Sequence, residues 1–289
     1  MTWISAELQA WLLASETDNG TYRHVLIEEN DADRPDGLAS LARLADEAHR
    51  DARERLERLL EISLDPLAGE QPTGWRHYPD ALHTSVLQGY LGELLAGLIA
   101  ENFRPHRRSW VVPAFLFRGH QAAHQELERR RQLGGPSRPI PGRTGDDALA
   151  FEIDDDDAIT SWLWVEAKCT HDHDAGLISA GHEQLSAAIR VPVDLMQLVD
   201  VLHDSVEPDS ERWIGSLREL FFATQTPPRF DMLVYVCGRK PQRKPTWIPT
   251  DAPHPKYTGP GPLEAVEVRL DDFDGVLVAT YPQHVINRG

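Results

Sequence analysis

Two stretches decide the fold: GDDALAF at residues 145–151 and WLWVEAK at residues 162–168. Each is a short apolar run with ionisable residues at one end, and four successive aspartates, residues 154–157, lie between them. Short apolar runs bounded by polar turn residues are typical of buried strands. We therefore predict strands over 147–153 and 161–169, joined as a hairpin.

Two carboxylates and an ammonium gather at one end of this hairpin. Because side chains alternate along a strand, Glu166 and Lys168 project to one face and Ala167 to the other. Asp147 stands at the start of the first strand, where a turn through the aspartates brings it toward Glu166. Its spacing to the apolar residues that follow favours Asp147, while the adjacent Asp146 stays open as an alternative. Such a group can bind a divalent metal and stabilise charge on a phosphate.

The use of lysine singles out Lys168. Of the 29 lysines and arginines only four are lysine, and Lys168 is the only one in the first 239 residues. An ammonium is a compact point charge that a planar guanidinium does not replace. A lone lysine inside an apolar strand therefore indicates that an ammonium is needed there. The competing interpretation is an exposed ion pair between Glu166 and Lys168, which contributes little to stability.

Helices and further strands surround the hairpin. We expect helices over 2–15, 40–62, 83–102, 178–204 and 210–223, and strands over 21–28, 230–237, 264–270 and 275–281. The residues rich in Pro and Gly over 65–80 predict a linker, and those over 241–262 predict a loop. Alternating helices and strands with mixed strand directions predict an α/β fold.

The helix before the hairpin carries a glutamate, Glu93, among small residues. Gly89, Gly92, Ala96 and Gly97 surround it. Interior glycine costs a helix about 1 kcal/mol relative to alanine, so these residues indicate the close approach of another backbone. The alternative is an ordinary glutamate on the helix surface.

The order of these features resembles the PD-(D/E)xK, or restriction-endonuclease-like, nuclease superfamily. The resemblance covers residues 83–237 and implies a mixed sheet flanked by helices. It implies Mg²⁺ or Mn²⁺ held by Asp147, Glu166 and Glu93, with Lys168 completing the catalytic group. Gln184, on the helix after the lysine strand, resembles a polar residue near the site in many members. One departure is that no proline precedes the aspartate.

The resemblance implies a nuclease domain over 81–289 and an acidic α/β N-terminal extension over 1–80 that can dock a partner or regulate the enzyme. It implies hydrolysis of phosphodiester bonds, of DNA in the first place, with RNA not excluded. The layout also resembles the nuclease subunit of the Hachiman anti-phage defence system, which implies prokaryotic defence and a controlling partner helicase. Other defence or restriction nucleases of this fold are alternatives. A further alternative is a catalytically inactive module that binds nucleic acid or protein.

Composition limits the possible partners. A formal charge of −17 argues against a protein that coats nucleic acid or anionic membranes through its overall field. However, residues 104–143 hold nine arginines against two glutamates, and these arginines can track a phosphate backbone. No apolar run reaches the roughly 18 residues of a membrane-spanning helix. Two cysteines, Cys169 and Cys237, give no disulfide framework, so we expect a cytoplasmic protein.

A zinc site is a weaker alternative for the residues after the lysine strand. Cys169, His171, His173 and His182 supply one thiol and three imidazoles. Their spacing matches no standard zinc framework, so we expect a polar loop here instead.

Overall fold

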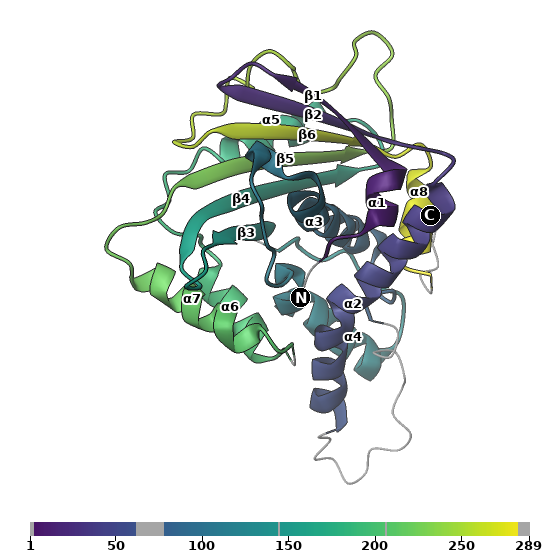
Figure 1. Cartoon of the computed structure of the whole chain (residues 1–289). Coiled ribbons are helices and arrows are strands. Elements are labelled where there is room, and N and C mark those ends of the chain that lie inside the picture. Colours follow the sequence, from purple (N-terminus) through teal and green to yellow (C-terminus); the bar gives the residue numbers. More distant parts are fainter. Residues whose placement is uncertain (1–2, 62–77, 144, 206, 283–289) are drawn as a thin grey trace.

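A computed structural model describes residues 3–61, 78–143, 145–205 and 207–282 of the chain (Figure 1). Its centre is a six-stranded mixed sheet in the order β1-β2-β6-β5-β4-β3. The strands are β1 Leu12–Asp18, β2 Tyr22–Glu29, β3 Ala148–Ile153, β4 Ile159–Thr170, β5 Arg229–Cys237 and β6 Leu263–Arg269. The four inner strands run parallel, and the edge strands β1 and β3 pair antiparallel with β2 and β4. The predicted α/β fold with mixed strand directions is thus confirmed.

Helices cover both faces of the sheet (Figure 1). They are α1 Ala6–Trp11, α2 Arg34–Glu61, α3 Thr84–Phe103, α4 Gln121–Leu133, α5 Ala175–Gln184, α6 Leu195–His203, α7 Ser210–Phe222 and α8 Phe273–Thr280, with short 3-10 turns η2 Pro105–Arg107 and η3 Leu116–Gly119. Alternate residues of β4 enter two separate cores. Leu163 and Val165 join the core around α3, whereas Trp162 and Trp164 join the core around α6 and α7.

Helix α3 is the buried helix against β4. Fifteen of its 20 residues are buried, which fits its apolar surface on every side. A Cβ at Gly92 would lie 2.7 Å from the Cβ of Cys169, and one at Gly97 would overlap the ring of Phe115. The predicted close approach is confirmed at Gly92, which places the backbone of α3 directly on β4, whereas Gly97 meets only a side chain and a Cβ at Gly89 would meet nothing within 4 Å.

The predicted hairpin and most other elements are confirmed, with one element of the wrong type. The strand predicted over 275–281 is the helix α8. Asp272 caps it by accepting a hydrogen bond from the N–H of Gly275. Phe273, Val276 and Leu277 are buried at helical spacing, so the apolar run lies along one face of a helix.

Two predicted helices are also corrected. The helix predicted over 2–15 ends at Trp11, and Leu12–Asp18 forms the edge strand β1 instead. The helix predicted over 178–204 is two helices, α5 and α6. Pro192 lies in the break between them, and proline lacks the N–H that a continuous helix needs.

The predicted N-terminal extension, residues 1–80, shares the sheet with the rest of the chain. Strand β2 pairs with β6 along its length, and buried residues of α1 and α2 belong to the core around α3. Its division from 81–289 as a docking or regulatory region stays a prediction. Most of the linker predicted over 65–80 lies outside the described residues. Within the described ranges, no helix is both long and apolar enough to cross a membrane.

Candidate active site

The register of the hairpin places Asp147 opposite Glu166. Ala148 pairs with Val165 in the antiparallel ladder, so the preceding residue, Asp147, faces the residue that follows Val165. Asp147 Oδ2 also accepts a hydrogen bond of 2.8 Å from the backbone N–H of Ala167. This bond fixes the carboxylate across the end of β4, as the hairpin pattern predicts.

Glu166 and Lys168 lie together on the face of β4 that α5 covers. The ammonium of Lys168 donates a hydrogen bond to Glu166 Oε1. A Cβ at Gly181 of α5 would lie 3.6 Å from the Cγ atoms of both residues and 2.6 Å from Leu233 Cδ1. Glu166 is fully buried, while the Lys168 side chain is 21% exposed. The exposed ion pair considered as an alternative is therefore not what the chain forms.

The two carboxyl groups have strongly perturbed acidities. Burial raises the pKa of Glu166 to about 9, and the negative charge of Asp147 adds to this effect. Burial also raises the pKa of Asp147, against the opposing effects of Lys168 and the Ala167 N–H. Desolvation alone would lower the pKa of Lys168, but Glu166 and Asp147 raise it above its ordinary value. At neutral pH the site therefore holds a charged ammonium beside a carboxyl pair that retains a proton.

Glu93 approaches the site from α3 but is bound to an arginine. Arg143 Nη2 lies 3.6 Å from Glu93 Oε2, and Arg143 Nη1 donates to Asp194 Oδ2 at 2.7 Å. Burial raises the pKa of Glu93 to about 8; Arg143 lowers it and Asp147 raises it. Glu93 is thus close enough to Asp147 for their charges to interact, with Arg143 neutralising part of that repulsion.

Asp146 has a different role from Asp147. Its side chain is fully buried, and its Oδ2 accepts a hydrogen bond of 2.9 Å from the backbone N–H of Asp194. Its own N–H donates to Asp194 Oδ2, also at 2.9 Å. Burial raises the pKa of Asp146 to about 6. This reciprocal pair ties the start of β3 to the chain before α6, and leaves Asp147 as the aspartate that faces Glu166.

Gly145 allows Asp146 and Asp194 to meet. Its φ of +116° is a conformation that side chains disfavour, and a Cβ there would overlap the Asp194 carboxylate. We expect Gly145→Ala to lower the free energy of unfolding by about 1–3 kcal/mol, measured by urea denaturation. Gly142→Ala is the matched control, because a Cβ at Gly142 meets nothing within 4 Å. Equal stability of the two variants would contradict this role of Gly145.

Gln184 does not reach the carboxylates in this structure. It is exposed at the end of α5, and its Nε2 donates to the carbonyl of Gly145 at 3.3 Å. It therefore contacts the loop that supports Asp147 rather than Asp147 itself. Its predicted role at the reaction centre remains untested.

Two residues beside the predicted group, Arg143 and Asp194, could not be singled out from the sequence. Arg143 was counted only as one member of the Arg-rich stretch, although it stands four residues before Asp147. Asp194 follows a proline-containing break 47 positions beyond Asp147, and no motif marks it. Only the folded chain brings it to the site.

The donor atoms at Asp147 and Glu166 fit a hard divalent cation. Both groups carry carboxylate oxygens, and Glu166 Oε2 has no hydrogen-bond partner among the described residues. A cation there would favour the charged forms of both carboxyl groups, whose pKa values burial raises. Among the described residues no group of three or more Asp, Glu, His or Cys side chains is placed to hold a metal ion. Glu93, the third ligand that the resemblance implies, is paired with Arg143. Its role as a metal ligand stays a prediction.

Many arginines of the stretch 104–143 already have partners. Arg118 is buried and binds Asp51 at 2.7 Å, so it is not available to nucleic acid. Others form surface ion pairs: Arg107 with Asp18, Arg108 with Glu152, and Arg129 with Glu126. This leaves fewer cations for a phosphate backbone than the sequence predicts.

The cysteine and histidines of the zinc alternative have separate partners. His173 stacks on Trp247 at 3.6 Å between ring centroids and hydrogen-bonds Tyr235. His182 Nδ1 bonds the carbonyl of Ile178, and Cys169 packs against Gly92 on the opposite side of β4. The polar-loop interpretation therefore agrees better with the structure than a zinc site.

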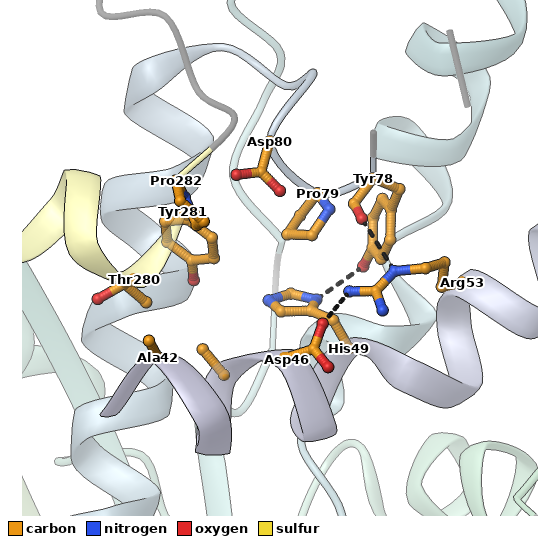
Figure 2. Close-up of a pocket in the computed structure, with 11 residues that line it drawn as sticks. Ala42, Asp46, His49, Arg53, Tyr78, Pro79, Asp80, Thr280, Tyr281 and Pro282 are labelled. Atoms are coloured by element: carbon orange, nitrogen blue, oxygen red, sulfur yellow. Dashed lines mark hydrogen bonds and ion pairs between the residues drawn. The ribbon is translucent and has the colours of Figure 1, made fainter. Parts of the chain in front are cut away.

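A separate pocket of about 350 Å³ lies between α2, residues 78–80 and the end of α8 (Figure 2). His49 hydrogen-bonds the hydroxyl of Tyr78 there at 3.3 Å, and burial lowers the pKa of His49 well below its ordinary value. Arg53 donates to Asp46 and to the carbonyl of Tyr78. None of the predicted site residues lines this pocket, so it is not part of the candidate active site.

In comparisons with known proteins, the chain matches no protein-family model and no curated protein.

Proposed function

We propose that this protein is a metal-dependent nuclease of the PD-(D/E)xK type that hydrolyses phosphodiester bonds of DNA. The observation that carries the proposal is the meeting of Asp147, Glu166 and Lys168 at one end of the hairpin. Two facing carboxylates beside an ammonium form a group suited to a divalent cation and a phosphate. A buried pair of carboxyl groups with raised pKa values beside a charged partner is also typical of functional sites.

Each of these residues has a distinct role in the proposed reaction. Asp147 and Glu166 would hold Mg²⁺ or Mn²⁺, which when bound lowers the pKa of water and polarises the phosphate. Lys168 keeps its proton at neutral pH, because its pKa is raised. It therefore acts as a fixed positive charge that stabilises the developing phosphate charge and orients water, rather than as a general base.

The arrangement of elements around the site supports a restriction-endonuclease-like fold. Helix α3 precedes the β3–β4 hairpin, α5 follows it on the opposite face, and β5 then pairs parallel with β4. This is the order that the resemblance implies for residues 83–237. The position of Glu93 on α3 near Asp147 agrees with it as well.

The wider setting of the proposal comes from the resemblance of layout to the Hachiman nuclease subunit. On that basis the protein acts in the cytoplasm of a prokaryote in anti-phage defence or restriction, under control of a partner helicase. Strands β1 and β2 and helix α2 of the acidic N-terminal region lie beside the nuclease core and can serve as the docking surface.

We expect the protein to cleave supercoiled plasmid DNA with Mg²⁺ or Mn²⁺, and to be inactive in excess EDTA. Ca²⁺ should bind without supporting cleavage, because only some coordination geometries activate water. Gel electrophoresis measures the cleavage, with single-stranded RNA as a parallel substrate. Asp147→Asn should abolish it, whereas Asp155→Asn, at the exposed turn of the same hairpin, should not.

Two results would contradict the proposal. Full cleavage in EDTA would exclude the metal-dependent reaction. DNA binding in a gel-shift assay with no cleavage under any metal, alone or with a candidate partner helicase, would instead favour the inactive binding module.

A further inference from the structure

The pocket of about 350 Å³ between α2, residues 78–80 and the end of α8 has the dimensions of a ligand site (Figure 2). Sites for small molecules span about 300–1,000 Å³ and combine apolar walls with a few polar groups that orient the ligand. The apolar residues in this wall are Ala42, Ala45, Pro79 and Pro282. Polar side chains lie between them, so the pocket has both kinds of lining.

Two deeply buried polar atoms in this pocket have no partner. His49 and Tyr281 line it, and each residue is only 1% exposed. Neither His49 Nε2 nor the Tyr281 hydroxyl makes a hydrogen bond to any described residue. The two rings lie edge to face with their centroids 5.9 Å apart. Buried polar groups in folded proteins nearly always have a partner, so these two atoms indicate a molecule bound beside them.

The surroundings of His49 fix its orientation. Its Nδ1 hydrogen-bonds the hydroxyl of Tyr78 at 3.3 Å, and its ring stacks on Phe117 with centroids 4.4 Å apart. Figure 2 shows the other ring nitrogen turned toward the side of Tyr281. Burial lowers the pKa of His49 well below its ordinary value, so the imidazole is neutral at pH 7. Since a neutral imidazole carries one donor and one acceptor, Nε2 offers whichever of the two Nδ1 does not use.

The charged residues around the pocket disfavour an anion. Asp46, Asp80 and Arg53 line it. Arg53 donates to Asp46 at 2.8 Å and to the carbonyl of Tyr78 at 3.3 Å, so its guanidinium is engaged within the wall. Two carboxylates against one guanidinium leave a net negative charge, which repels a phosphate. Carboxylates accept hydrogen bonds from hydroxyl groups, so the pocket suits an uncharged ligand with O–H donors.

We propose that this pocket binds an uncharged ring that carries hydroxyl groups, held by His49 Nε2 and the Tyr281 hydroxyl. A phenol hydroxyl both donates and accepts, so the two atoms together can bind one O–H group. A nucleoside and a free monosaccharide share this chemistry. The site is independent of the proposed nuclease activity, because no residue of the candidate active site lines the pocket.

Isothermal titration calorimetry of the full chain, in EDTA, tests the pocket without any need for DNA cleavage. The probes are the four ribonucleosides, D-ribose and D-glucose, and we expect at least one of them to bind saturably at one site. Tyr281→Phe removes only the hydroxyl and should weaken the Kd about fivefold, as expected for one hydrogen bond. Because this hydroxyl has no partner in the protein, the variant should unfold at the wild-type temperature or above it.

Tyr22→Phe is the matched control. Tyr22 belongs to the other core, around α6 and α7, and its hydroxyl donates to the carbonyl of Pro249 at 2.9 Å. Loss of that bond should lower the unfolding temperature but leave the Kd within about twofold.

The panel also identifies the source of the ring. Binding of a nucleoside but of neither sugar assigns the pocket to nucleosides, and the reverse assigns it to monosaccharides. Either result supports the pocket, even if the carboxylate site proves inactive. No binding of any probe, or equal weakening by Tyr281→Phe and Tyr22→Phe, would overturn the proposal. Tighter binding of a nucleoside 5′-monophosphate than of its nucleoside would overturn it as well, since the charges of the pocket oppose a phosphate.

Discussion

Lys168→Arg is expected to lower the rate of DNA cleavage on the order of 100-fold or more, while the fold remains intact. The substitution keeps the positive charge, so the attraction to the carboxyl pair of Asp147 and Glu166 survives it. However, the ammonium contacts a fully buried carboxylate beneath Gly181, where a larger planar cation must shift the reacting groups. A displacement of about 1 Å can cost this much in rate.

Single-turnover cleavage of plasmid DNA measures this effect, and thermal unfolding reports on the fold. Lys256→Arg is the matched control. Lys256 also pairs with a glutamate, Glu183, at 2.6 Å, but both side chains are exposed. We expect that variant to retain full activity. Cleavage near the wild-type rate in Lys168→Arg, with unchanged stability, would remove the main reason for assigning Lys168 a catalytic role.

Glu166→Gln is expected to abolish cleavage and yet to raise the unfolding temperature by on the order of 5 °C at pH 8 in EDTA. The amide cannot ionise, so it avoids the cost of a buried carboxylate beside Asp147. The pKa of Glu166 is about 9 in the folded chain against an ordinary value of 4.5. A raised pKa contributes stability that is present below pH 4.5 and is lost as pH rises toward 9.

The difference in unfolding temperature should therefore be small at pH 5 and should grow with pH. Differential scanning fluorimetry across this range measures it. Glu183→Gln, at an exposed glutamate, should show no such pH-dependent gain. A Glu166→Gln variant less stable than wild type at pH 8 would show that the native site prefers the charged carboxylate, contrary to the pKa argument.

The hairpin and the meeting of its ionisable residues could be predicted because they depend on local patterns. Alternation places Glu166 and Lys168 on one face whatever the rest of the chain does, and the pairing register then fixes Asp147. The small residues of α3 indicated its contact with β4 for a similar reason. A glycine that costs helix stability is retained where another backbone must come close.

The features that were missed depend on distant parts of the chain. Strand β1 is mostly exposed and lacks apolar alternation, and it forms because β2 offers a free edge. The short apolar run of α8 fits a strand as well as a helix. Only its burial against the core around α3 shows that its apolar residues follow the helical spacing. Asp194 reaches Asp146 through a loop, so no local pattern predicts their reciprocal hydrogen bonds.

The parallel pairing of β2 with β6 has a consequence for how the protein is made. Tyr22 of β2 lies beside Leu263 of β6, so the two partners emerge from the ribosome some 240 residues apart. Pairings between such distant segments form slowly, since a long loop must close before any contact is gained. During synthesis the edge of β2 therefore stays unpaired until β6 has been made. Until β6 has been made the sheet is incomplete, and the unpaired edge of β2 is open to chaperones and to aggregation.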